Sequence, residues 1–349
     1  MEFIFTEKLK LSSIANILAK EKRRFRFWML LLLFIVLVFS LLELSLGSAG
    51  VSFIEVLFPK SDYALFVLRE IRIPRLLTAV LIGATLSFAG LLLQTVFRNP
   101  LVGPSVLGIS SGASLGVALV TMAGFNSFFI SDEVPKVAAA IVFSLAVLFL
   151  LFSIAGRFKD HASVLIVGML ISYLAGAVVD ILIFMSDNDA LKEFTLWGMG
   201  SFSRMGYGEI ALLSALLLIS YIIVHRHRHL MNLYLIGELD EVNEQKKRKL
   251  VLLLLLLGGV ITAFVTAFCG PIAFIGIAIP NLLRFVLRIS DHKYLLPGSI
   301  MLGAAVALMC DLLSTMPWTN HSLPVNAVTA LFGIPIIVFM IFKSRQSSI

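Results

Sequence analysis

The sequence predicts an all-α polytopic membrane protein with about ten transmembrane helices. Of its 349 residues, 59% are hydrophobic and 14% are charged, and the mean hydropathy is +1.00. Soluble domains carry about 25% charged residues, so this composition excludes an ordinary soluble protein. The second observation is a series of apolar stretches, each close to the ~20 residues that a helix needs to cross a bilayer.

Ten apolar stretches each predict one membrane-spanning helix. In chain order they are residues 27–47, 75–97, 105–125, 136–156, 163–186, 209–227, 249–269, 272–289, 296–316 and 323–343. The first is too long for a signal peptide and lacks a small-residue cleavage site, so we expect it to remain as a span. The eighth is the weakest, because Pro280, Asn281 and Arg284 interrupt it.

The segments outside these stretches are short. They predict an N-terminal cytoplasmic tail over residues 1–26, a transmembrane domain over 27–343 and a C-terminal cytoplasmic tail over 344–349. Between the first two spans, Val51–Phe58 is amphipathic enough for a short surface helix. None of the polar segments is long enough to fold as a soluble domain.

The distribution of basic residues predicts the orientation of the chain, because cytoplasmic loops are enriched in Lys and Arg. With the N-terminus inside, most of the 28 Lys and Arg residues fall on inner segments, including the run 20–26 and the loop 228–248. We therefore predict that both termini are cytoplasmic. The formal net charge of +7 is explained by attraction to anionic lipid and does not indicate a nucleic-acid partner.

Several kinds of reactive site have no sequence support. The chain contains no Gly-Lys dipeptide, so it lacks the loop that cradles nucleotide phosphates. Cys269 and Cys310 have no paired spacing that would indicate a disulfide or a metal site. His225, His227 and His229 alternate with arginines, an arrangement compatible with a metal site but better explained as a basic cuff facing lipid. We predict no catalytic residue, no metal and no cofactor bound by this chain.

Charged residues inside spans are costly and indicate function or pairing. Asp180 lies in the outer part of the fifth span, Asp311 near the outer end of the ninth and Arg284 toward the inner end of the eighth. We interpret Asp180 either as part of a transport pathway or as a hydrated surface carboxylate, and we expect Asp311 to cap or pair locally. A secondary transporter driven by protons or sodium would need such a carboxylate near mid-membrane.

Three outer arginines, Arg69, Arg72 and Arg75, recur at a spacing of three residues. On a helix they would share one face. Two interpretations remain open. They could anchor the helix end to lipid phosphates, or they could dock an acidic partner, since a guanidinium binds carboxylates in a bidentate fork.

A break and a run of small residues follow these arginines. Asn99 and Pro100 interrupt the apolar pattern, and Gly108 and Gly112 begin a stretch dense in Gly, Ser and Ala. Small residues let helices approach closely in lipid. The residues predicted to pack helices or to line a translocation path are Gly90, Gln94, Asn99, Pro100, Gly108, Gly112, Asp180, Gly270, Pro271, Gly276, Gly333 and Pro335.

Six ordered motif blocks run through residues 25–343. They are Arg72–Arg75 (RIPR) with Gly83-Ala84, Gly90–Gln94 with Asn99–Leu101, Gly108–Ala113, Trp197–Ser201, Gly270–Gly276, and a final set of Leu296-Pro297, Gly303-Ala304, Asp311, Leu323–Val325, Gly333 and Pro335. This order resembles the FecCD-type permeases, the membrane subunits of ABC importers for iron-siderophore, haem and cobalamin.

The resemblance implies a fold, partners and site residues. A ten-helix subunit would dimerise with a second permease subunit around a central path, two separate ATPase subunits would dock on the cytoplasmic side, and an extracytoplasmic binding protein would deliver substrate. By this resemblance Arg72 and Arg75, with Arg69 beside them, would dock the binding protein. The coupling segment between the sixth and seventh spans would contact the ATPase through Gly237, Glu238, Asp240 and Glu241.

The chain also departs from the family pattern. Thr315 stands where the family has an Arg, Ser322 where it has a Glu before Leu-Pro, and Asn281 where it has a His. After Gly237 and Glu238 the coupling segment loses the expected Ala and Leu-Gly. Such departures are compatible with a heterodimer in which a sister subunit supplies the missing groups.

The resulting prediction is a permease subunit of an ABC importer for ferric siderophore in the inner membrane of a bacterium. Transport would proceed by alternating access driven by the ATPase subunits. The alternatives are a haem or cobalamin importer within the same family and, from other classes, a self-sufficient secondary transporter or a structural membrane scaffold.

Overall fold

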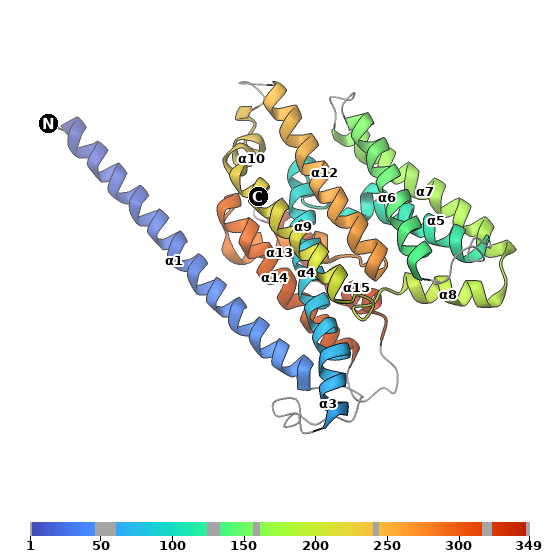
Figure 1. The fold of residues 1–349 in the computed structure, drawn as a ribbon. Helices are drawn as coiled ribbons and strands as arrows, with labels where there is room; N and C mark the ends of the chain where they lie inside the picture. The colour runs from blue at the N-terminus through green and yellow to red at the C-terminus, as the bar shows by residue number, and fades with distance from the viewer. Residues whose placement is uncertain are drawn as a thin grey trace.

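The computed structural model describes residues 2–45, 61–123, 133–155, 161–239, 244–315 and 323–346, and these residues form helices and connecting turns without a strand. The longer helices are α1 (Glu2–Ser45), α4 (Ile73–Val96), α5 (Ile109–Met122), α6 (Glu133–Ala155), α7 (His161–Met185), α9 (Tyr207–Arg226), α12 (Glu244–Cys269), α13 (Ile275–Leu287), α14 (His292–Ser314) and α15 (Val325–Gln346). Figure 1 shows them as a bundle with α1 along one side.

Each of the ten predicted spans coincides with one of these helices. Within the described residues, seven helical segments are long and apolar enough to cross a membrane. The other three, in α5, α13 and α15, are apolar but shorter, at 10–17 residues. Pro280 lies inside α13, which has only 13 residues. The predicted weakness of the eighth stretch therefore corresponds to a short helix.

Shorter elements connect the long helices. On the side of the bundle where α4 begins they are α3 (Asp62–Phe66), the π-helix η1 (Val67–Arg72) and α8 (Asn188–Gly198). The 3₁₀-helix η2 (Pro104–Leu107) precedes α5, and α10 (Arg228–Leu235) follows α9. The predicted surface helix Val51–Phe58 lies outside the described residues.

Helix α4 occupies the centre of the fold and is buried over almost all of its length, from Thr78 to Val96. It packs against α12, α13 and α14, and Figure 1 shows it enclosed by other helices. A helix that is apolar on every side is expected in such a buried position. The sequence of α4 therefore favours the core of the bundle over its lipid-facing rim.

Close helix approach at α4 depends on pairs of glycines. A Cβ atom added to Gly83 would overlap the backbone oxygen of Gly303 in α14, and one added to Gly90 would overlap the backbone oxygen of Gly276 in α13. Helices associate in lipid largely through van der Waals packing, which small residues at the contact improve. The predicted packing role of Gly90 and Gly276 matches this geometry.

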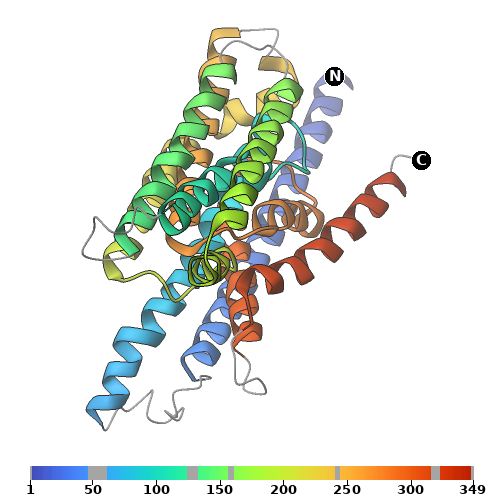
Figure 2. The ribbon, with the colours of Figure 1, turned by 90° about the vertical axis from the view of Figure 1, so that its right-hand side faces the viewer.

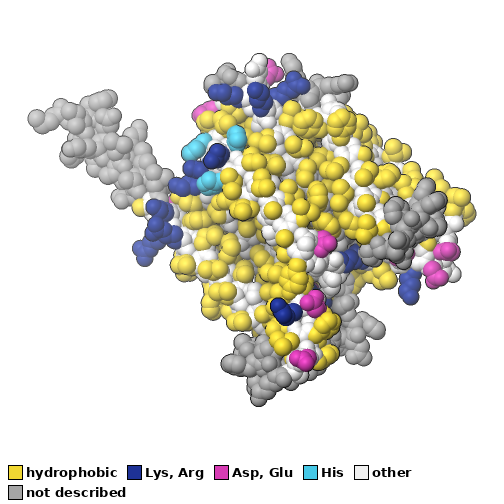
Figure 3. Space-filling model, viewed as in Figure 1, with side chains coloured by type: hydrophobic (Ala, Val, Ile, Leu, Met, Phe, Trp, Pro, Cys, Tyr) yellow, Lys and Arg dark blue, Asp and Glu magenta, His cyan; other side chains and the backbone are white. Residues whose placement is uncertain are grey.

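The rim of the bundle consists of α1, α6, α7, α9 and α15. Helix α1 packs along α14, where the rings of Phe25 and Tyr294 lie 4.8 Å apart. It also contacts α13, where Arg24 Nη2 donates to the Val286 carbonyl at 2.6 Å. Figure 2 shows α15 leaning outward from the bundle. Figure 3 shows a broad hydrophobic surface, with Lys, Arg, Asp and Glu gathered toward its two ends. This is the pattern expected of a protein that crosses a bilayer.

Candidate functional site

An arginine–carboxylate fork joins α4 to α14 at the end of the bundle where α4 begins. Arg75 donates from Nη2 to Asp311 Oδ1 at 2.5 Å and from Nε to Asp311 Oδ2 at 3.0 Å. Asp311 has no exposed surface, and the Arg75 side chain is 21% exposed. Ser314 Oγ also donates to Asp311 Oδ1 at 3.2 Å. The expectation that Asp311 pairs locally is thus only half right, because its principal partner lies on another helix.

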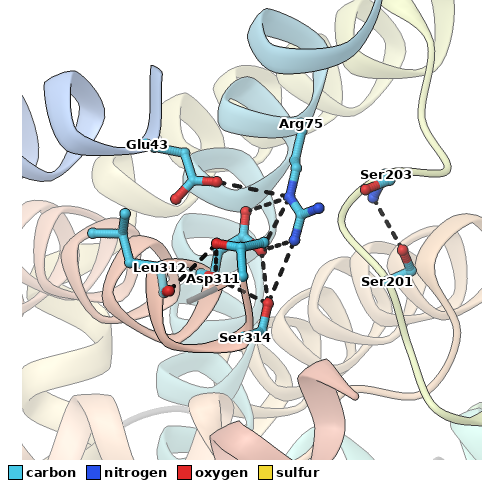
Figure 4. Close-up of polar contacts among 8 residues, drawn as sticks. Glu43, Arg75, Ser201, Ser203, Asp311, Leu312 and Ser314 are labelled. Atoms are coloured by element: carbon cyan, nitrogen blue, oxygen red, sulfur yellow. Dashed lines mark hydrogen bonds and ion pairs between the residues drawn. The ribbon is translucent and has the colours of Figure 1, made fainter. Parts of the chain in front are cut away.

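Glu43 is a third acidic or basic member of this cluster, and it was not among the predicted site residues. It lies near the end of α1, 5% exposed, with Oε1 at 3.7 Å from Arg75 Nε. Figure 4 shows the guanidinium in contact with both Glu43 and Asp311, which lie on the same side of it, with the Ser201–Ser203 turn on the other side. Glu43 could have been identified from the sequence, because a glutamate near the end of an apolar stretch indicates a partner for a buried basic group.

The three outer arginines do not share one exposed face, so that prediction is wrong. Arg69 is exposed, whereas Arg72 is only 6% exposed and donates from Nη1 to the Leu44 carbonyl. The reason is the π-helix η1, Val67–Arg72, whose wider turn changes the register that α-helical spacing assumes. Arg72 and Arg75 therefore make contacts within this chain, and Arg69 is the arginine that faces outward.

The Gly270 segment forms a break between α12 and α13. Gly270 has φ +77°, a conformation that favours glycine, and Ser201 N–H donates to the Cys269 carbonyl beside it at 2.9 Å. Phe274 also has positive φ, at +68°. Gly333 of α15 lies against Phe274, where an added Cβ would overlap the phenylalanine side chain. Gly270, Pro271 and Gly333, predicted as packing or path residues, thus meet around this break.

Two further predicted glycines hold α5 in place. Gly108 has φ +78° and ends η2, and an added Cβ there would lie 2.8 Å from the Gly168 carbonyl oxygen of α7. At Gly112 the same addition would lie 2.9 Å from the Phe143 carbonyl oxygen of α6. Both positions require close backbone approach, which explains why the sequence has glycine there.

A polar network joins α4 to α13 at the opposite end of α4. Gln94 accepts from Arg284 Nη1 at 2.5 Å, and its Nε2 donates to the Ile277 carbonyl at 3.2 Å. Asn281 Nδ2 donates to the carbonyls of Pro100 at 2.6 Å and Ile277 at 2.9 Å. The side chains of Gln94 and Asn281 are buried. Asn281 and Arg284 interrupt the apolar pattern of the eighth predicted span. In the structure, Arg284 joins α13 to α4 and Asn281 joins α13 to the turn that follows α4.

The Asn99-Pro100 break forms the turn between α4 and η2. Asn99 Oδ1 accepts from Leu101 N–H at 2.9 Å, a local bond that stabilises turns in place of helix. Pro100 is exposed, and its carbonyl is the acceptor for Asn281. These predicted path residues lie at the same end of the bundle as α10.

Helix α10 is fastened to the C-terminal end of α4. Tyr234, fully buried, donates from its hydroxyl to the Val96 carbonyl at 2.8 Å. Arg98 Nη2 donates to the Tyr234 carbonyl at 2.6 Å, and its guanidinium carbon lies 4.1 Å from the Tyr234 ring centroid. Arg98 has φ +46°, which is uncommon for a residue other than glycine. This strained conformation directs the guanidinium onto Tyr234.

The same helix is fastened to the start of α14. Asn232 Nδ2 donates to Asp291 Oδ1 at 2.7 Å, and Asn232 Oδ1 pairs with His292 Nδ1 at 2.6 Å. His292, fully buried, also pairs with Thr95 Oγ1 at 2.9 Å. Burial opposes ionisation of Asp291, but hydrogen bonds from the Lys293 N–H and Asn232, together with the positive potential of the nearby histidines, lower its pKa. The His292 side chain therefore links α14 to both α10 and α4.

The predicted coupling residues follow α10 directly. Gly237 has φ +87° with open space around its Cα, and Glu238 is exposed. Asp240 and Glu241 lie outside the described residues. Ile236 is 66% exposed and Leu233 is 37% exposed. Next to the buried contacts of Tyr234, α10 thus presents an uncovered surface of mixed apolar and acidic character.

Asp180 and Pro335 lie on exposed rim helices. Asp180 is on α7, and nothing lies within 4 Å of a Cβ added to Gly176, one turn before it. Phe184 on the same helix is 91% exposed. Pro335 is an exposed residue inside α15. These two residues are not brought close to the fork or to the α10 cluster by any described contact.

Comparison with known proteins gives one consistent result. The model of the FecCD transport family matches residues 32–343. The chain is 31% identical over 323 residues to the hemin transport system permease protein HmuU of Yersinia pestis, covering 90% of this chain and 95% of HmuU. It is 30% identical over 334 residues to the vitamin B12 import system permease protein BtuC of Shigella boydii, covering 94% and 99%.

A solved structure has the same fold. It is described as an inward-facing conformation of a metal-chelate type ABC transporter, with a TM-score of 0.76, 27% identity and coverage of 89% of this chain and 97% of that chain. Its match extends over the same bundle that carries the fork and the α10 cluster. The chain therefore belongs to the FecCD transport family and is a multi-pass permease of an ABC importer in the bacterial inner membrane.

Proposed function

We propose that this chain forms half of a permease dimer that moves a metal chelate inward by alternating access, powered by two separate ATPase subunits. The observation that carries the proposal is α10, which is tied by buried hydrogen bonds to α4 and α14 while Leu233, Ile236 and Glu238 stay exposed. A surface that is rigidly joined to two central helices can transmit a push from a partner to the bundle.

The exposed surface of α10 is the proposed ATPase contact. Apolar side chains such as Ile236, placed beside an acidic residue, suit a protein interface with an apolar centre and a polar rim. Gly237, Glu238, Asp240 and Glu241 belong to the same coupling segment by family resemblance. ATP would be bound by the partner subunits, and this chain would hold no cofactor, carry no metal and catalyse no reaction.

Asp180 supports a second permease subunit next to α7. A carboxylate turned toward lipid is costly, so it favours a water-filled path or a protein partner on this face. Asp180 is exposed on a helix whose Tyr173 and Phe184 are also exposed. We propose that α7 faces the central path and the second subunit, which would be either an identical chain or a sister chain.

Arg69, Arg72 and Arg75 are the proposed contact for an extracytoplasmic binding protein. Arg69 is exposed, and Arg75 retains 21% of its side-chain surface. An acidic side chain arriving at Arg75 would compete with Asp311 and Glu43 for the guanidinium. The structure of the fork therefore favours Arg69 as the initial contact and makes Arg75 a secondary one.

Ferric siderophore is the proposed substrate, with haem and cobalamin as the second candidate. The second candidate is favoured by the relatives, which are described as hemin and vitamin B12 permeases. A metal chelate is the class that includes all three.

Reconstitution tests the transport proposal against a secondary transporter. The chain would be co-purified with its ATPase and binding protein, placed in vesicles, and supplied separately with ferric siderophore, hemin and cyanocobalamin. ATP-dependent uptake of one chelate, absent when the ATPase is omitted, is the expected result. Uptake by the chain alone, driven by a proton or sodium gradient, would contradict the proposal.

A further inference from the structure

An apolar groove lies between α1, α9 and α14, away from the fork and the α10 cluster. It has a volume of about 490 Å³. Its lining includes Met29 of α1, Leu81 of α4, Leu218 of α9 and Pro297 of α14. Only Ser214 and Tyr221 bring hydroxyl groups to its lining. Such a surface in a membrane-spanning region is suited to hydrocarbon.

The groove lies in the half of the membrane nearest α10. Tyr221 is five residues before Arg226, the end of α9, which corresponds to about 7–8 Å along a helix that rises 1.5 Å per residue. Ser214 lies about 18 Å from the same end by the same rise. A lipid of the adjacent leaflet would therefore have its headgroup close to the end of α9 and its acyl chain in the groove.

The headgroup end of the groove is basic. The Tyr221 ring stacks on His225, with centroids 5.4 Å apart and planes at 29°. Arg228 Nη1 donates to the His225 carbonyl at 3.2 Å. Among the residues that the structure describes, Arg228 Nε and His225 Nδ1 are buried without a hydrogen-bond partner. A buried polar group without a hydrogen-bond partner is unfavourable, so an additional acceptor is expected here.

We propose that this groove binds one anionic phospholipid, with an acyl chain between α1 and α9 and its phosphate at Arg228 and His225. A phosphate oxygen accepts hydrogen bonds from both groups. A lipid with net negative charge is favoured by the guanidinium of Arg228, which lies at this end of the groove, and Figure 3 shows histidines beside Lys and Arg at the edge of the hydrophobic surface. A zwitterionic lipid would leave this positive charge uncompensated.

The size of the groove favours a lipid chain over a protein helix. A helix is 10–12 Å across and rises 1.5 Å per residue, so 490 Å³ would hold only about three or four of its residues. A flexible hydrocarbon chain can fill the same space along its length. The groove is thus matched to a lipid and not to a second copy of a transmembrane helix.

Native mass spectrometry of the delipidated full-length chain tests the proposal. Phosphatidylglycerol and phosphatidylcholine with identical acyl chains would be titrated separately. We expect one phosphatidylglycerol to bind about tenfold or more tightly than phosphatidylcholine, since hydrogen bonds to a charged group contribute about 1.5–3 kcal/mol. Equal affinities for the two lipids would overturn the proposal, and this result needs no variant.

Three variants locate the lipid. Arg228→Gln should weaken phosphatidylglycerol binding by about tenfold, from the loss of a charge-assisted bond. Arg226→Gln is the matched control, because Arg226 is exposed and carries the same charge two residues before Arg228. Its affinity for phosphatidylglycerol should stay within about twofold of the wild-type value. Ser214→Trp fills the groove from an exposed position without changing charge, and it should abolish the tight binding.

Each other outcome contradicts the proposal. Equal losses in Arg228→Gln and Arg226→Gln would indicate diffuse attraction to anionic lipid. Loss in Arg228→Gln with unchanged binding in Ser214→Trp would indicate a phosphate site alone, and competition by millimolar inorganic phosphate would identify it. A dimer that dissociates in Ser214→Trp would indicate a protein occupant. Thermal unfolding of each variant establishes that it is folded.

Discussion

The Arg75 guanidinium and the Asp311 carboxylate form a bidentate pair across 236 residues of sequence. Their helices, α4 and α14, are also in contact through Gly83 and Gly303. Ion pairing at one end and glycine packing along the shared surface make α4 and α14 a single rigid unit. Helix α13 joins the same unit, because Gln94 of α4 pairs with Arg284 and with the Ile277 carbonyl.

Removing the Asp311 charge should destabilise the protein strongly. Asp311→Asn leaves the largely buried Arg75 without its principal counter-charge, and breaking a buried pair in this way costs about 3–5 kcal/mol. Asp180→Asn is the matched control, since Asp180 is exposed. Denaturant unfolding in detergent measures both. Equal stabilities of the two variants would show that the fork contributes nothing.

Gly90→Ala should destabilise the bundle, whereas Gly176→Ala should not. The added methyl group at Gly90 would overlap the Gly276 backbone, and overpacking typically costs about 1–3 kcal/mol. At Gly176 nothing lies within 4 Å, and alanine is the better helix former by about 1 kcal/mol. The two unfolding midpoints should therefore shift in opposite directions. A stable Gly90→Ala variant would rule out the close helix contact.

Tyr234→Phe tests whether α10 transmits force to α4. It removes one buried hydrogen bond to Val96, at a cost of about 0.5–1.5 kcal/mol, so the chain should still fold. In the reconstituted transporter, ATP hydrolysis should continue while uptake per ATP falls. Tyr63→Phe makes the same chemical change in α3, at a residue that is 62% exposed, and its uptake per ATP should be unchanged. An unaltered ratio in Tyr234→Phe would place the coupling elsewhere.

The contribution of Asp291 should depend on pH. Its folded pKa is lowered, so the ionised form stabilises the fold at neutral pH, and this advantage fades as pH falls below about 3.9, the usual pKa of an unfolded Asp. Wild type should therefore be more stable than Asp291→Asn at pH 7. The two should converge in stability as pH approaches the folded pKa. A difference that is independent of pH would exclude ionisation as its source.

Cysteine labelling tests the predicted orientation. The native Cys269 and Cys310 are both fully buried and give little background. Asp189→Cys and Gln245→Cys place single thiols at exposed positions predicted to lie outside and inside, respectively. A membrane-impermeant maleimide added to intact spheroplasts should label only Asp189→Cys. Labelling of both positions would refute the ten-span arrangement.

Helix positions could be predicted from the sequence because apolar length is a direct consequence of crossing a bilayer. The ten predicted stretches coincide with α1, α4, α5, α6, α7, α9, α12, α13, α14 and α15. The lengths of α5 and α13 could not be predicted, because Gly and Pro breaks shorten a helix without reducing its hydropathy. The π-helix η1 could not be predicted either, because its wider turn leaves no mark on hydropathy. The prediction that Arg69, Arg72 and Arg75 share one helix face assumed α-helical spacing and was wrong for that reason.

Site residues could be predicted where the residue type alone indicates its role. They were missed where the role depends on a partner from a distant helix. Gly90, Gly276 and Gln94 could be identified, since small or amide residues in an apolar helix stand out. The pairing of Tyr234 with Val96, or of His292 with Thr95, depends on tertiary contacts between separate helices. A single sequence gives no signal for such pairs.

The order of synthesis gives Glu43 a role that the folded contacts alone do not suggest. Ribosomes add about 5–20 residues per second, so the 236 residues between Arg75 and Asp311 represent about 10–50 s at that rate. Throughout this interval Arg75 has been made but its partner Asp311 has not. Glu43 precedes Arg75 in the chain and lies 3.7 Å from it when folded. It is therefore the one member of this cluster that is made early enough to contact Arg75 before α14 is synthesised.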